Sequence, residues 1–151
     1  MTTFPSPVDP PHMLKSPAFA QGMIAGPGSM LYIGGQNGTD DAGVLSEGLG
    51  AQTEQALVNV LSVLAEAGTG PEYVVKLTIY LAPGVDPGAA YAATASVWGK
   101  RRTAVTVLAI APAREGALVE IEAIAVVPSA AVGTHPTGAG VLQEGSPTVA
   151  E

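Results

Sequence analysis

The sequence predicts an α+β protein in which one mixed β-sheet carries two helices packed on one face. Two segments have the spacing or end signals of helices, and five short segments are typical of strands. Their order along the chain is β-β-α-β-α-β-β, which fits a single sheet covered on one side. A length of 151 residues suits one domain with its own core.

The N-terminal part is expected to be an irregular arm followed by a hairpin. Residues 1–11 contain four prolines and show no periodicity, so we interpret them as the arm and place the domain at 12–128. The stretch "AQGMIAGPGSMLYIGGQ" consists of two apolar runs around "GPGS", whose Gly and Pro favour a turn. This pattern predicts a β-hairpin.

Residues 48–67 are predicted to form an amphipathic helix. Glu54, Asn59, Ser62 and Glu66 lie at other positions of the helix, and Gly68 is a typical residue for ending it. The side chains that recur at helical spacing are Thr53, Leu57, Val60, Leu61 and Leu64.

The middle of the chain predicts a strand and then a second helix. In "EYVVKLTIYLAPG" the residues Val75, Leu77, Ile79 and Leu81 alternate with polar or aromatic ones, as in a half-buried strand. The alanine-rich residues 86–99 begin with an Asp-Pro pair suited to the cap and first position of a helix.

The last two strands are expected in "TAVTVLAI" and "ALVEIEAIAVV", joined by "APAREG". With a period of two, Val119, Ile121, Ala123 and Ala125 make a small apolar face suited to packing under the helices. Glu120 and Glu122 point the other way, together with Leu118, Ile124 and Val126. That face is either open to water or an oligomer interface with a polar site, and its apolar members favour the interface.

The residues after this strand show no usable pattern. The segment 129–151 is rich in Gly, Pro, Ser, Thr and Ala, so we expect a flexible C-terminal tail.

Composition limits the possible functions. Only 13% of residues are charged, about half the usual share, which suggests that partner subunits cover apolar surface. A net charge of -7 argues against nucleic acid as a partner. The absence of cysteine excludes thiolate chemistry. Without a signal peptide or a membrane-spanning run, we expect a cytoplasmic protein.

Basic residues cluster at one place. Lys100, Arg101 and Arg102 are half of the six basic residues and directly precede a predicted strand. They could simply favour the C-terminal dipole of the second helix. An arginine there could instead bind a carboxylate through its planar pair of donors. The sequence does not place Arg102 near Glu120 within one chain.

Several of these segments together resemble one family. "LYIGGQNG", the helix "AQTEQALVNVLSVLAEAG", "VVKLTIYL", "RTAVTV" and "GALVEIEAIAVV" are similar to the reactive-intermediate deaminase family, called Rid or YjgF. The resemblance runs from about Phe19 to Pro128 and implies a chorismate-mutase-like fold and a homotrimer. It also implies active clefts between subunits, which would bring the arginine of one chain to the glutamate of another.

The resemblance further implies an activity and its residues. Family members hydrolyse enamine and imine intermediates to a 2-keto acid and ammonia without metal or cofactor. By matching motifs, Arg102 would hold the substrate carboxylate and Glu120 would position water, whereas Glu122 would have a structural or rim role. Phe19, Gly35 and Ala104 would line the substrate pocket. The expected ligand is a small imino or keto acid.

The chain also departs from the family pattern. Phe19 lacks the hydroxyl of a tyrosine, Gly34 replaces a serine, and Ala92 replaces an asparagine. The alternative function is therefore a non-catalytic trimer that binds a small carboxylate or serves as an interaction module. The ribonuclease label that the family also carries fits an acidic chain less well. His12 lies next to the expected arm and His135 in the expected tail, so we predict no metal site from them.

Overall fold

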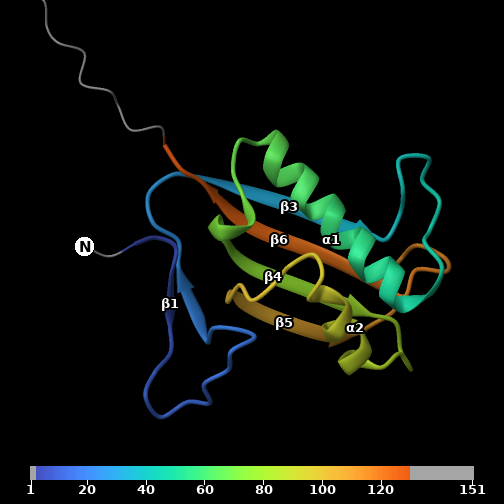
Figure 1. Ribbon diagram of the computed structural model, residues 1–151, viewed down its shortest axis with the longest axis horizontal. Coiled ribbons are helices and arrows are strands. Elements are labelled where there is room, and N and C mark those ends of the chain that lie inside the picture. The colour runs from blue at the N-terminus through green and yellow to red at the C-terminus, as the bar shows by residue number, and fades with distance from the viewer. Residues whose placement is uncertain (1–2, 130–151) are drawn as a thin grey trace, which may run out of the picture.

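The computed structural model describes residues 3–129 and confirms an α+β fold with one mixed sheet and two helices (Figure 1). A second, two-stranded sheet lies to one side. The elements in chain order are β1 (Ser6–Val8), β2 (Gly22–Ile24), β3 (Ser29–Asn37), α1 (Gly48–Glu66), the 3-10 turn η1 (Pro71–Tyr73), β4 (Val74–Leu81), α2 (Pro87–Thr94), β5 (Ala104–Ala109) and β6 (Val119–Val127).

The main sheet has the strand order β3-β6-β4-β5. The last strand, β6, is inserted at the centre and runs antiparallel to both β3 and β4. β4 and β5 are parallel, and the connection between them contains α2, because parallel strands need a crossover. The last two strands of the chain are therefore not neighbours in the sheet.

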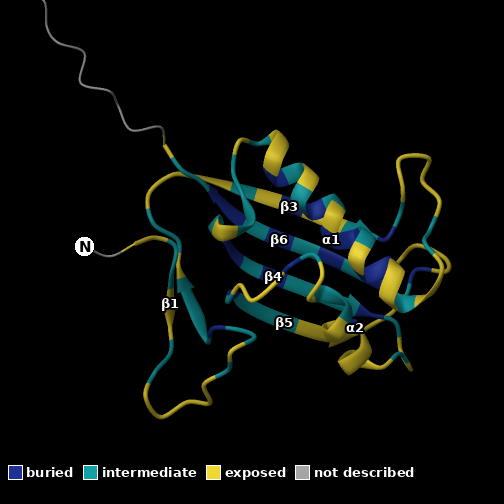
Figure 2. Cartoon of the chain, in the orientation of Figure 1, coloured by how far each residue is buried: buried dark blue, intermediate teal, exposed yellow. Residues whose placement is uncertain are grey.

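The core lies between α1 and the centre of the sheet (Figure 2). The predicted apolar face of β6 is confirmed, since Val119, Ile121, Ala123 and Ala125 are all buried in this cluster. α1 meets them with a stripe at helical spacing that includes Leu57, Val60 and Leu64, also buried. Glu120 and Glu122 consequently leave the helix-covered side.

The helix ends follow the sequence signals except at one point. Gly68, with φ +72°, ends α1 as predicted, and the Asp86 side chain caps α2 by accepting from the Gly88 amide at 2.9 Å. However, α2 ends at Thr94 and does not continue to residue 99. The Thr94 carbonyl accepts from the Trp98 amide in a turn, and this turn buries the Trp98 side chain.

The N-terminal prediction was wrong in two respects. Residues 6–8 are not irregular, because they pair with Gly22–Ile24 as β1 and β2. The segments on either side of "GPGS" do not form a hairpin either, since β2 belongs to the small sheet and β3 to the main one. The chain crosses between the sheets through Gly26 and Gly28, both at positive φ, and Gly28 packs too close to β6 for a side chain.

The apolar face predicted for β4 was wrong at its first residue. Val74, and not Val75, joins Leu77 and Leu81 in the core cluster. The pairing of β4 with β6 shifts between Val74 and Lys76, so the strict alternation is interrupted there. A local irregularity of this kind leaves no mark in the apolar pattern.

Two expectations concern the ends of the chain and membranes. The tail predicted for 129–151 lies, from residue 130 onward, outside the described residues. Among residues 3–129, no helix is long and apolar enough to cross a membrane.

Candidate functional site

The structure separates the predicted site residues into two groups. Phe19, Arg102 and Ala104 lie together at the start of β5, whereas Gly35 and Glu120 lie together on β3 and β6. On the shared neighbour β4, Ala104 is level with Lys76 and Glu120 is level with Tyr80. Four residues of strand span about 13 Å, and Arg102 is further away still. One chain therefore does not bring Arg102 to Glu120.

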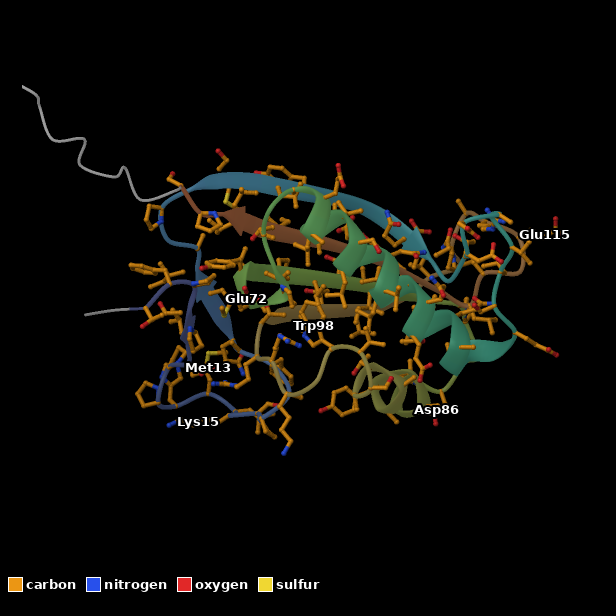
Figure 3. The ribbon with its side chains drawn as sticks, turned by 45° about the horizontal axis from the view of Figure 1, so that its top comes forward. Met13, Lys15, Glu72, Asp86, Trp98 and Glu115 are labelled. Atoms are coloured by element: carbon orange, nitrogen blue, oxygen red, sulfur yellow. The ribbon has the colours of Figure 1, made fainter. Side chains whose placement is uncertain are left out.

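Figure 3 shows the same separation at the level of the loops. Met13 and Lys15, in the segment that joins β1 to β2, lie at one end of the molecule. Glu115, in the loop that leads into β6, lies at the other end. We call Phe19, Arg102 and Ala104 the arginine half-site. Gly35 and Glu120 form the glutamate half-site.

The arginine half-site is built where residues 18–21 run beside the start of β5. The Ala20 amide donates to the Thr103 carbonyl at 2.9 Å, and Ala20 bridges to Ala104. The Thr103 hydroxyl is buried and donates to the Val74 carbonyl, which anchors this end of β5 to β4. The Arg102 guanidinium then donates to the Phe19 carbonyl from Nε at 3.3 Å and from Nη2 at 3.0 Å.

A carboxylate of the same chain already contacts Arg102. Asp9 Oδ2 lies 2.7 Å from Arg102 Nη2, the single salt bridge within residues 3–129. Asp9 Oδ1 accepts from the Gln21 amide at 3.0 Å. The Gln21 amide and then the Arg102 hydrogen bond hold the pKa of Asp9 below its usual value of 3.8.

The two neighbouring arginines have different surroundings. Arg101 is exposed and turns back to donate to the Trp98 carbonyl at the end of the turn that follows α2. Arg102 points to Phe19 and Asp9. Of the two arginines, Arg102 is therefore the one that lies beside Phe19, and its role in a site stays a prediction.

The glutamate half-site depends on a bulge in β3. Between Ile33 and Gln36 the pairing with β6 shifts by one residue, and the bulge contains Gly34 and Gly35. A Cβ on Gly35 would overlap the Glu120 carboxylate, whereas one on Gly34 would meet nothing within 4 Å. The absence of a side chain at Gly35 thus leaves the space that the Glu120 carboxylate fills.

Two polar residues orient this end of the sheet. Asn37 Nδ2 donates to the Val119 carbonyl at 3.2 Å and to Glu120 Oε2 at 3.4 Å. Tyr80, directly opposite Glu120 on β4, donates its hydroxyl to Glu122 Oε1 at 3.1 Å. Burial, followed by the hydrogen bond to Glu122 and by the charges of both glutamates, raises the pKa of Tyr80 above 10.0.

Each half-site adjoins a cavity. A cleft of about 240 Å³ is lined by Tyr80, Glu120, Glu122 and residues 110–113. An apolar cavity of about 220 Å³ lies between the helices and β4–β5 and is lined in part by Phe19, Ala90, Trp98 and Val105. The Trp98 side chain is labelled in Figure 3, near the crossing of the chain from α2 to β5.

Metal-binding groups are not clustered in the part of the chain that the structure describes. No three His, Asp or Glu side chains there are arranged to hold a metal ion. His12 is exposed, and His135 lies outside residues 3–129.

Three polar residues of these half-sites were not predicted from the sequence. Asp9 lies in a stretch interpreted as an irregular arm, and only the fold brings it to Arg102. In the sequence, Tyr80 was only one of the polar or aromatic positions that alternate with the apolar residues of a predicted strand. Asn37 is the second residue after the Gly34–Gly35 pair, and glycines inside a strand, which often mark a bulge, were the available signal for it.

The comparisons with known proteins concern the family and the fold. The family model described as endoribonuclease L-PSP matches residues 13–127. A solved structure of the Rid protein YyfB from Yersinia pestis, itself of unknown function, is 30% identical with a TM-score of 0.72 and covers 81% of this chain and 98% of its own. The RidA structure from Psychrobacter is 26% identical with a TM-score of 0.62 and covers 83% of this chain and 97% of its own.

Fold and family follow from these matches. The fold places it among small α+β proteins with one mixed sheet and two helices. The chain belongs to the Rid or YjgF family, whose model carries the name endoribonuclease L-PSP.

One relative of this chain is a mitochondrial protein, which bears on the cellular location. The mitochondrial protein mmf1 of Schizosaccharomyces pombe is 29% identical over 127 residues, which are 80% of this chain and 75% of that protein. A cytoplasmic location for this chain stays a prediction.

Proposed function

We propose that this protein is a cofactor-independent deaminase that hydrolyses reactive enamine or imine intermediates to a 2-keto acid and ammonia. The active unit in this proposal is a homotrimer of chorismate-mutase-like subunits, with each cleft between two chains. The separation of the two half-sites supports this arrangement. An arginine half-site of one chain next to the glutamate half-site of another would supply both charges to one substrate.

The observation that carries the proposal is the glutamate half-site. The glycine bulge and Asn37 direct the Glu120 carboxylate toward a cleft wall, where it has neither a lysine nor an arginine partner within residues 3–129. A carboxylate held in this way can accept a proton from water.

The chemistry needs little more than positioning. Arg102 would bind the carboxylate of a 2-imino acid, and Glu120 would take a proton from the attacking water. The new C–O bond forms at the imine carbon while the imine nitrogen gains a proton from solvent. In the resulting carbinolamine the nitrogen takes the proton that Glu120 holds and the hydroxyl group gives its proton to solvent. The C–N bond then breaks, which releases ammonia and leaves the 2-keto acid. An imine is already electrophilic, so fixed geometry can provide much of the acceleration.

The test is ammonia release from an imine generated in situ by an amino-acid oxidase. Glu120→Gln should lower turnover by on the order of a hundredfold, because it removes the general base. Arg102→Ala should weaken substrate binding about ten- to a hundredfold. Glu122→Gln is the matched control on the same strand and face, and it should retain most of the turnover. Unchanged rates in both site variants, measured against buffer alone, would contradict deamination.

A non-catalytic, carboxylate-binding trimer is the second candidate. It is favoured by the Asp9 contact on Arg102 and by the polar groups lost at Phe19, Gly34 and Ala92. Binding of 2-oxobutyrate that depends on Arg102, without any ammonia release above the buffer rate, would support it.

A further inference from the structure

The contacts of Arg102 leave an incoming carboxylate few donors. A guanidinium offers five N–H groups. Nε and one N–H of Nη2 point to the Phe19 carbonyl, and Nη2 also contacts Asp9 Oδ2. Within residues 3–129, the Arg102 side chain donates only to Phe19 and Asp9, and neither of them accepts from Nη1.

Bidentate binding of a carboxylate uses two parallel N–H groups on adjacent nitrogens. The pair formed by Nε and Nη2 faces the Phe19 carbonyl. The pair formed by Nη1 and Nη2 is shared with Asp9. A second carboxylate can therefore use this pair only when Asp9 leaves Nη2.

We propose that Asp9 is an internal carboxylate ligand of Arg102, which competes with the substrate carboxylate and thereby determines the affinity of the site. This inference rests on the proposed function, because it takes Arg102 as the substrate anchor. Asp9 and the substrate carry the same charged group, so each excludes the other from Nη2.

The surroundings of the pair make an exchange feasible. The side chain of Arg102 is 31% exposed and that of Asp9 is 17% exposed, so water reaches both. Asp9 belongs to the segment that follows β1, and β1 pairs with β2 outside the main sheet. The two hydrogen bonds to the Phe19 carbonyl do not involve Asp9, and they continue to orient Arg102 after the exchange.

A purely positioning role for Asp9 predicts the opposite result. If Asp9 serves to hold Arg102 in place, its loss weakens carboxylate binding. If Asp9 competes, its loss strengthens binding. The sign of the change therefore distinguishes the two roles.

The experiment compares Asp9→Asn with the unchanged full-length chain in a calorimetric titration with 2-oxobutyrate. Asparagine keeps an oxygen for the Gln21 amide but removes the negative charge from Arg102. We expect the affinity to rise on the order of three- to tenfold, as for the loss of a partly exposed competing ion pair. Asp41→Asn is the matched control, because it makes the same change in net charge at an exposed residue. Its affinity should stay unchanged.

An equal or lower affinity of Asp9→Asn overturns the inference, and so does the absence of measurable binding in both chains. Asp9→Ser, which keeps a short acceptor for Gln21, replaces Asp9→Asn if that variant does not fold. Arg102→Ala, made alone and with Asp9→Asn, separates the two proposals. If it leaves 2-oxobutyrate binding unchanged, Arg102 is not the anchor and the proposed function fails. If Arg102→Ala abolishes 2-oxobutyrate binding and Asp9→Asn does not strengthen that binding, only the proposed role of Asp9 fails.

Discussion

At the scale of single residues, the glutamate half-site depends on what is missing at Gly35. Adjacent glycines occupy one bulge, but only Gly35 faces the Glu120 carboxylate. The obstacle to a side chain there is the end of a flexible glutamate and not the backbone. A small side chain at this position should therefore move the carboxylate without unfolding the protein.

Gly35→Ala tests this reasoning. We expect a loss of about 1 kcal/mol in the free energy of unfolding, because Glu120 can rotate away. Imine hydrolysis should fall about ten- to a hundredfold, since a displaced base no longer meets its water. Gly34→Ala is the control and should change neither quantity much. Equal losses of activity in the two variants would show that the bulge matters only as backbone.

At the scale of elements, the helix α1 is held to the sheet by one buried stripe. Leu64 is fully buried against the centre of the sheet, whereas Val58 on the same helix is 42% exposed. Leu64→Ala should lower the free energy of unfolding by about 2–5 kcal/mol, because it leaves a cavity. Val58→Ala should change it by less than about 1 kcal/mol. Denaturant unfolding followed by circular dichroism measures both.

A second contact between elements joins the N-terminal segment to β5 through Asp9 and Arg102. The pKa of Asp9 is lowered in the folded state, first by the Gln21 amide and then by Arg102. Its contribution to stability is therefore present above the unfolded pKa near 3.8 and is lost as the pH falls through the folded value.

Melting temperatures measured between pH 7 and pH 2 should show this loss. Below about pH 4 the unchanged chain should lose the stability that Asp9 contributes. Asp9→Asn should melt at a lower temperature at pH 7 and show a smaller decrease on acidification. Parallel curves for the two chains would indicate that the ion pair contributes nothing to stability.

At the scale of the whole molecule, the sheet face that carries no helix bears large apolar side chains. Tyr32 on β3 is 72% exposed, and Met30 and Leu108 are also exposed. By strand register, all three share this face with Ile124 and Glu120. We propose that this face forms the trimer interface, in agreement with a charged fraction of only 13%.

Light scattering at micromolar concentration should therefore give about three times the chain mass of 15.0 kDa. Ile124→Glu should dissociate the assembly and abolish imine hydrolysis, because it places a charge in the centre of this face. Val58→Glu, on the outer side of α1, should leave the assembly intact. A monomer in the unchanged chain would contradict both the trimer and the shared cleft.

Elements that follow a local period could be predicted from the amino-acid sequence. The helix α1, the strand β4 and the two faces of β6 could be predicted, because burial on one side imposes a period of 3.6 or 2 on the apolar residues. The start of α2 was predicted from its Asp-Pro pair and its alanine content, but its end was not. The Asp86 cap and the ending of α1 at Gly68 could be predicted as well, since each depends on neighbouring residues only. The closeness of Phe19 to Arg102 was implied by the family resemblance and agrees with the structure.

Only the tertiary structure decided which distant segments meet. The insertion of β6 between β3 and β4 separates the last two strands, and the pairing of β1 with β2 replaces the expected hairpin. The contacts of Asp9 with Arg102 and of Gly35 with Glu120 span 93 and 85 positions of the chain. No local period records such contacts, because strand pairing uses backbone groups that every residue carries. The bulges in β3 and β4 escaped prediction for the same reason, since a one-residue shift in register is set by the partner strand.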